Sequence, residues 1–203
     1  HSAEKNTGQL WESYRLDNPM GNTPLLTMLS DQVAGPRPTL SFDSTGTGFS
    51  TRDGSGITEL ITVNSDLTDA ALIGSTGLGS GTNGSGYNPA NDTLYLINNT
   101  TDSLYSVDRT NGTVTTIGSL GLDYFNGGAE IFNGTLYGFI QDVARNMFVF
   151  GEINTNTGTF VAIRDIAAYD PNTTFFSGLT AVPAPGTLAL LGLGGLAASR
   201  RRR

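Results

Sequence analysis

The chain has 203 residues, of which 27 are glycine and only 14% are charged, and its formal net charge is −7. Removing the +4 of the four C-terminal arginines from −7 leaves −11 on the rest of the chain, which argues against nucleic acid as a partner. There is no cysteine, and the only histidine is His1, which argues against disulfides, Ser-His-Asp catalysis and Cys- or His-ligated metals. We therefore predict no catalytic residues, no metal and no cofactor.

The sequence divides into three parts. We predict a disordered N-terminal stretch over residues 1–9, a β domain over 10–181 and a separate tail over 182–203. Glycine, threonine and asparagine recur throughout the middle part, a mixture typical of short strands joined by tight turns. The start HSAEKNTGQLW lacks the pattern of a signal peptide, so we expect either that such a segment has been removed or that the chain continues a longer protein.

Four similar segments recur in the β domain, and each predicts a hairpin. Each opens on an aliphatic residue, continues with Asp or Asn, and has another aliphatic residue ten positions after the first. Asp and Asn bond to the backbone two residues on, and a Gly in three of the four segments supplies a positive φ, so the middle of each segment indicates a turn. The segments cover residues 16–26, 63–73, 107–117 and 153–163.

The spacing of these hairpins predicts the architecture. Their starts are 47, 44 and 46 residues apart, close to the roughly 40–50 residues of one four-stranded propeller blade. Upstream pieces of each period, which contain Gly48-Phe49, Leu94-Tyr95 and Leu136-Tyr137, indicate an inner strand, a turn and a second strand. We predict an all-β, β-propeller-like repeat of four-stranded blades, with a β-sandwich or β-solenoid as the alternative.

The two ends of the β domain resemble different parts of one blade. The domain begins near Leu10 and Trp11 in the outer half of a blade, whereas residues 175–182 (FFSGLTAV) resemble the inner strand that starts one. A closed arrangement in which this last strand completes the first blade gives four blades and protects the sheet edges. A fragment of a larger propeller is an equally serious alternative.

The segment LYSVDRTNGTVTTIG, residues 104–118, resembles a broad group of secreted bacterial propeller-like repeats. The resemblance covers about residues 10 to 180. Its motifs concern turns and packing, so it implies a fold and no ligand.

Two patterns are candidates for carbohydrate chemistry. Tyr124 and Phe125 form an aromatic pair that is the candidate for stacking on sugars. A glycosidase or lyase needs two carboxylates that face one cleft, although solvated loop positions are the simpler interpretation. The acids that lie close together in sequence are Asp123, Glu130, Asp142 and Glu152.

Two further patterns have simpler structural interpretations. Residues 43–48 (DSTGTG), Asp66 and Asp69 offer oxygen ligands for calcium, but they do not match the twelve-residue calcium loop. Residues 77–86 (GLGSGTNGSG) lack the Lys-Ser/Thr ending of a phosphate-binding loop, so they predict a flexible loop between blades.

The tail predicts a short membrane segment. As a helix, residues 187–199 span about 20 Å, less than a bilayer core of about 30 Å, so the pattern favours a transient anchor. The arginines would stay on the cytoplasmic side and place the acidic body outside. The three parts of the predicted signal are Val182, Pro183, Ala184 and Pro185; the transmembrane residues Thr187, Leu188, Leu190, Leu191, Leu193 and Leu196; and the basic stop Arg200, Arg201, Arg202 and Arg203.

In this three-part order the tail resembles the PEP-CTERM sorting signal of Gram-negative and related bacteria, with Ala184 in place of the usual Glu. The resemblance implies export across the inner membrane, recognition by an exosortase as processing partner, and cleavage near the Pro-Ala-Pro segment. It further implies a mature body at the cell surface, the outer membrane or an extracellular matrix. A simple C-terminal membrane anchor is the alternative.

Our hypothesis is an exported, non-enzymatic protein with a role in adhesion or matrix assembly and exopolysaccharide as its candidate partner. One alternative is an exported carbohydrate-active enzyme, a lyase or glycosidase, on the same scaffold. Another is a permanently membrane-anchored binding protein.

Overall fold

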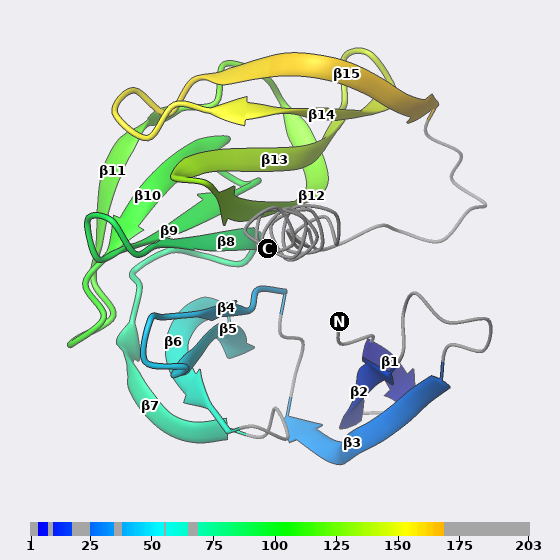
Figure 1. The fold of residues 1–203 in the computed structure, drawn as a ribbon, viewed down its shortest axis with the longest axis vertical. Helices are drawn as coiled ribbons and strands as arrows, with labels where there is room; N and C mark the ends of the chain where they lie inside the picture. The colour runs from blue at the N-terminus through cyan, green and yellow to red at the C-terminus, as the bar shows by residue number, and fades with distance from the viewer. Residues whose placement is uncertain are drawn as a thin grey trace, which may run out of the picture.

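The computed structural model describes residues 4–7, 10–17, 25–34, 38–54, 56–64 and 69–168. These residues form fifteen β-strands and, within the ranges just given, no helix (Figure 1). The all-β prediction is therefore confirmed for the described part of the chain. The predicted closing strand 175–182 and the predicted hydrophobic helix of the tail lie outside the described residues.

Three four-stranded antiparallel sheets make up most of the body. The first contains β4 (Ser41–Phe42), β5 (Gly48–Gly54), β6 (Ile57–Val63) and β7 (Asp69–Ser75). The second contains β8 (Thr82–Asn88), β9 (Thr93–Asn98), β10 (Ser103–Val107) and β11 (Val114–Ser119). The third contains β12 (Tyr124–Phe132), β13 (Thr135–Asp142), β14 (Met147–Ile153) and β15 (Phe160–Ala168).

The three sheets follow one another around an arc in chain order (Figure 1). Strands that are consecutive in the chain are neighbours in every sheet. The first strands lie innermost, with β8 in contact with both β4 and β12, and the fourth strands lie at the periphery. This arrangement is that of successive propeller blades.

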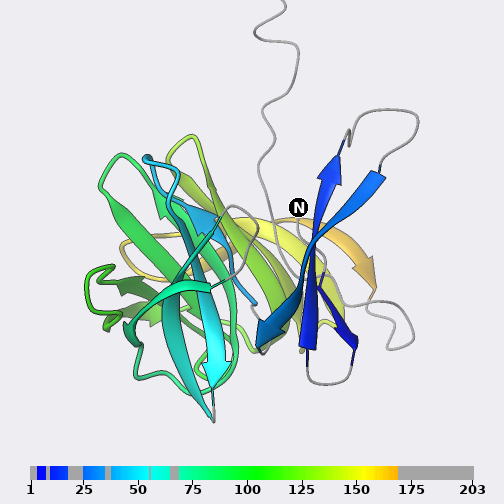
Figure 2. The same cartoon turned by 90° about the horizontal axis from the view of Figure 1, so that it is seen from below.

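A smaller sheet precedes them and consists of β1 (Glu4–Thr7), β2 (Leu10–Asp17) and β3 (Leu25–Ala34). Figure 2 shows that it stands to one side of the sheets β4–β7 and β8–β11. Strand β1 falls within the stretch 1–9 that the sequence predicts to be disordered. The difference arises because β1 pairs antiparallel with β2, which satisfies the backbone N–H and C=O groups of β1. The residues of β1 are polar, so they show no hydrophobic alternation from which a strand could be predicted.

Three of the four predicted hairpins join the third and fourth strands of the four-stranded sheets. These three hairpins pair β6 with β7, β10 with β11 and β14 with β15, all antiparallel. Residues 65–68, between β6 and β7, lie outside the described residues. The fourth hairpin joins β2 to β3, with Leu16 opposite Leu26, and its turn lies outside the described residues. The predicted inner hairpins are also present, because β4 pairs with β5, β8 with β9 and β12 with β13.

The local chemistry of these turns explains why they form. In the turn after β10, Asp108 Oδ1 accepts the N–H of Thr110 at 2.8 Å, and Gly112 has a φ of 82°. In the turn after β14, Asn154 Oδ1 accepts the N–H of Asn156 at 2.9 Å, and Gly158 also has a φ of 82°. The Asx side chain fixes the start of each turn, and glycine adopts the left-handed conformation at its end.

Two hydrophobic clusters lie between successive sheets. Each fully buried aliphatic side chain in them contributes about 1.5–3 kcal/mol to the free energy of folding. The cluster between the first and second four-stranded sheets contains Phe49, Leu60, Tyr87, Leu94, Leu96 and Val107. The cluster between the second and third contains Tyr95, Ile97, Leu104, Leu120, Tyr124, Ala129, Leu136, Ile140, Val149, Ile153 and Phe160.

Glycines allow the sheets to approach closely at their outer strands. A Cβ on Gly74 in β7 would overlap the carbonyl oxygen of Asn111 in the next sheet's hairpin turn. A Cβ on Gly118 in β11 would overlap the carbonyl oxygen of Thr157 in the same way. The same contact between an outer strand and the following turn therefore recurs at two successive junctions.

One predicted loop is in part a strand. The sequence predicts a flexible loop over residues 77–86, but Thr82–Asn88 form the inner strand β8. Its glycines are required because a Cβ on Gly84 would lie 2.6 Å from the backbone nitrogen of Ala129. The glycine-rich composition here reflects close packing of β8 against β12.

Candidate functional site

The residues of the predicted sorting signal, Val182–Pro185, Thr187–Leu196 and Arg200–Arg203, lie outside the described part of the chain. Among the residues that are described, no helix has the length and apolar character needed to cross a bilayer. The same residues contain no group of three or more His, Cys, Asp or Glu side chains placed to hold a metal ion. The candidate sites of the body are therefore its aromatic and acidic side chains.

The structure separates the two members of the predicted sugar-stacking pair. Tyr124 is only 1% exposed, whereas Phe125 is 55% exposed. Tyr124 lies opposite Asp142, and a register shift before Gly127 places Phe125 in an irregular segment at the start of β12. Because Tyr124 packs in the core, only Phe125 can stack on a ligand.

Two amides from the neighbouring sheet hold the backbone of Phe125. Asn83 Nδ2 donates to the carbonyl oxygen of Phe125 at 3.1 Å, and Asn99 Nδ2 donates to the same oxygen. Asn99 is itself fixed, because its N–H donates to the carbonyl oxygen of Gly81 at 2.8 Å. An exposed ring on a constrained backbone, flanked by amide side chains, is suited to stacking and hydrogen bonding with a sugar.

Glu130 and Glu152 are the only two of the four candidate acids that the described register places on one sheet face. Both flank Tyr137, which pairs with Glu130 in β12 on one side and Glu152 in β14 on the other. Two strand spacings separate their Cα atoms by about 10 Å. Asp142 is buried, and its Oδ1 accepts the N–H of Arg145 at 3.0 Å.

The electrostatic surroundings of Glu130 differ from those of a surface acid. Burial raises the pKa of its carboxyl above the ordinary value, and the hydrogen bond from the N–H of Ile131 opposes this only in part. Glu152 is exposed. One half-buried acid and one exposed acid share this face, with the Tyr137 side chain between their strands.

The candidate calcium run is a turn whose oxygens are already engaged. Asp43 Oδ1 accepts the N–H groups of Thr45 and Thr47 at 2.9 and 3.0 Å. Its Oδ2 accepts a hydrogen bond from Arg109 at 2.9 Å. Asp66 lies outside the described residues.

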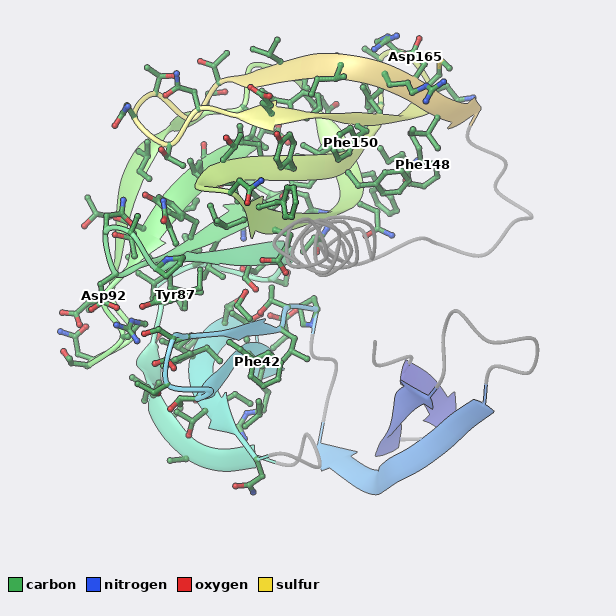
Figure 3. All side chains as sticks on the ribbon, viewed as in Figure 1. Phe42, Tyr87, Asp92, Phe148, Phe150 and Asp165 are labelled. Atoms are coloured by element: carbon green, nitrogen blue, oxygen red, sulfur yellow. The ribbon has the colours of Figure 1, made fainter. Side chains whose placement is uncertain are left out.

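Arg109 forms a contact between sheets that the sequence does not predict. It reaches from the β10–β11 turn to Asp43 of the preceding sheet and also bonds to Asp92. Its guanidinium lies 5.4 Å from the ring centroid of Phe49 and 5.1 Å from that of Tyr87 (Figure 3 labels Tyr87 and Asp92). No sequence signal could have identified it, because Asp43 and Arg109 are 66 residues apart.

The sheets and their order define a β-propeller-like protein, and solved structures share this fold. They include exo-β-1,3-galactanase from Phanerochaete chrysosporium, with TM-score 0.51, 13% identity and coverage of 81% of this chain and 49% of that one. A protein of unknown function from Bacteroides caccae has TM-score 0.50, 14% identity and coverage of 87% and 63%. A quinonprotein alcohol dehydrogenase-like protein from Bacteroides thetaiotaomicron has TM-score 0.50, 11% identity and coverage of 82% and 42%.

At these identities the similarity concerns the fold alone. The chain spans between 37% and 63% of the length of eight of the solved proteins that it matches. None of the curated proteins matches it in sequence.

Residues 181–203 match the PEP-CTERM protein-sorting motif. The match covers the segment that the sequence identifies as the sorting tail, within one residue at its start. The motif indicates a secreted protein that is processed by exosortase. The chain therefore combines a propeller-like body with an export and processing signal.

Proposed function

We propose that this chain is a non-enzymatic surface or matrix protein whose body binds neutral polysaccharide at Phe125. The observation that carries the proposal is the exposed Phe125 ring, whose backbone carbonyl is held by Asn83 and Asn99. A sugar ring stacks on an aromatic face without a large entropic cost when the aromatic residue is already fixed. The sorting motif would deliver such a module to the outside of the cell.

The charge of the body selects the class of polysaccharide. Without the four terminal arginines the formal net charge is −11, from the −7 of the whole chain. A field of this sign repels anionic polymers, so stacking and amide hydrogen bonds are better suited to neutral ones. We propose exopolysaccharide without charged groups as the partner.

The test is affinity electrophoresis of the protein through gels that contain neutral polysaccharides. The panel includes a β-1,3-galactan, because the fungal neighbour was solved with β-1,3-galactotriose. We expect Phe125→Ala to weaken binding about tenfold, which corresponds to about 1.4 kcal/mol. The matched control is Phe42→Ala, because Phe42 is also exposed but ends the inner strand β4 beside the first turn.

Equal binding by the wild type and Phe125→Ala would contradict the proposal, as would equal losses in both variants. Release of reducing ends from a polysaccharide would instead support the alternative of a carbohydrate-active enzyme. The observation that favours this alternative is the shared face of Glu130 and Glu152, so Glu130→Gln should then abolish the release. A permanently anchored binding protein would retain its tail in membranes.

A further inference from the structure

The sheet β12–β15 has an aromatic face on the side opposite to β8–β11. Across its strands, Phe139 pairs with Phe150 and Gln141 with Phe148. The rings of Tyr137 and Phe150 are stacked with centroids 5.4 Å apart, and those of Phe139 and Phe148 with centroids 5.1 Å apart. Figure 3 shows Phe148 and Phe150 on strand β14, away from the sheet β8–β11.

The preceding sheet, β8–β11, shows how the corresponding face packs. The residues of β8–β11 that correspond to Tyr137, Phe139 and Phe150 are Tyr95, Ile97 and Leu104 in the repeat. These three are buried in the cluster between that sheet and β12–β15. In β12–β15 the corresponding side chains are half-buried, although two of the three positions carry larger rings. The face is therefore built like one that packs against a following sheet.

The outer strands β7, β11 and β15 can be compared in the same way. Ile73 and Ile117 are extra residues at register shifts in β7 and β11, and both pack against the core clusters. Ile163 has the corresponding place in β15 but is 56% exposed. Arg164 follows it, where the other two strands have the glycine that admits a hairpin turn. A segment that covers this aromatic face would therefore cover the inner part of the sheet and leave the β15 edge in solvent.

We propose that residues 175–182 (FFSGLTAV), which lie outside the described residues, form an inner strand that packs beside β12 and covers this aromatic face. The chain order supports this occupant, because six residues link β15 to residue 175 and six residues also link β7 to β8. The triplet Phe176-Ser177-Gly178 corresponds to Phe125-Asn126-Gly127 at the start of β12.

This strand places the body directly against the sorting signal. The match to the PEP-CTERM motif begins at residue 181, and Pro183 lacks the N–H that would continue a strand. Cleavage at or after the Pro-Ala-Pro segment then removes the membrane segment but keeps the covering strand. The processed body would therefore keep its hydrophobic face covered by residues 175–182.

Hydrogen–deuterium exchange on the full-length protein tests this inference. We expect backbone amides of residues 175–182 to exchange at least tenfold more slowly than those of 187–203. Phe150→Asp should abolish this protection while the amides of β8–β11 remain protected, which shows in the same experiment that the rest of the body is folded. Val143→Asp is the matched control, because Val143 is exposed in the loop between β13 and β14 of the same sheet.

Exchange of residues 175–182 as fast as the tail in the wild type would overturn the proposal. Sedimentation provides the second criterion. If protection depends on protein concentration and follows the formation of a dimer, a second copy covers the face instead, and the proposal is wrong.

Discussion

Arg109 joins two sheets through charged and aromatic side chains. Its contact with Asp43 crosses the junction between β4–β7 and β8–β11, and its guanidinium lies against Phe49 and Tyr87. Arginine suits this position because its planar group can bond to two carboxylates while it stacks on rings. The side chains of Arg109 and Asp43 are largely buried, whereas that of Asp92 is exposed, so the Arg109–Asp43 pair contributes more than an ordinary surface ion pair.

We expect Arg109→Ala to lower the free energy of unfolding by about 2–3 kcal/mol, because the largely buried Asp43 carboxylate loses its partner. Arg145→Ala is the control, because the Arg145–Asp165 pair is exposed and lies within one sheet. The control should change stability by less than about 0.5 kcal/mol. Urea denaturation measures both values, and equal effects would show that the contact between sheets has no special role.

The same carboxylate predicts a dependence on pH. Burial alone would raise the pKa of Asp43, but the hydrogen bonds from Thr45 and Thr47 and the charge of Arg109 outweigh it and lower the pKa below 3.8. A group with a lowered folded-state pKa stabilises the fold fully above its ordinary pKa and loses this contribution as the pH falls through the folded-state value. We expect Asp43→Asn to reduce the difference in stability between pH 7 and pH 2.5, as measured by thermal unfolding.

At the scale of strands and turns, the glycine contacts set the distance between sheets. Gly118 in β11 and Gly158 in the following turn approach each other through their backbones, as Gly74 and Gly112 do one sheet earlier. No side chain fits in either contact. At this packing density, even one added methyl group would displace the surrounding backbone.

Gly118→Ala should therefore destabilise the protein by about 1–3 kcal/mol, because the new Cβ would overlap the carbonyl oxygen of Thr157. Gly79→Ala is the control, because a Cβ there meets no atom within 4 Å and the residue does not have a positive φ. Thermal unfolding of the two variants distinguishes them. A similar loss in both would mean that glycine acts here through backbone flexibility and not through close packing.

At the scale of the whole molecule, the sorting motif at residues 181–203 predicts processing. Expression in a bacterium that has an exosortase should yield a secreted body without Arg200–Arg203, which intact mass spectrometry measures. In a matched strain without exosortase, the tail should remain. A secreted protein that keeps all four arginines in the first host would contradict processing at this motif.

Local sequence patterns were sufficient to predict the repeated hairpins. Asp108 and Asn154 direct their turns through bonds within a few residues, and Gly112 and Gly158 complete them. The sorting tail was equally predictable from the sequence, because its three parts follow one another in the chain. The pairing of β1 with β2 was missed, because a polar strand at the edge of a small sheet has no hydrophobic alternation.

The candidate site was only half predictable. The sequence drew attention to Tyr124 and Phe125 together, but a register shift between β12 and β13 buries one and exposes the other. Asn83 and Asn99, which hold the Phe125 carbonyl, lie 42 and 26 residues away along the chain. Such contacts depend on how sheets pack, and no short-range pattern specifies them.

The sequence by itself determined the all-β class, the period of the repeat and the sorting tail, because strand alternation, turn residues and a linear signal are local properties. The tertiary structure alone decided which aromatic side chain is exposed, which acids share a face and that Arg109 joins two sheets. These features require residues from separate periods to meet. Their geometry is set by the register between strands and the close approach of glycine backbones between sheets.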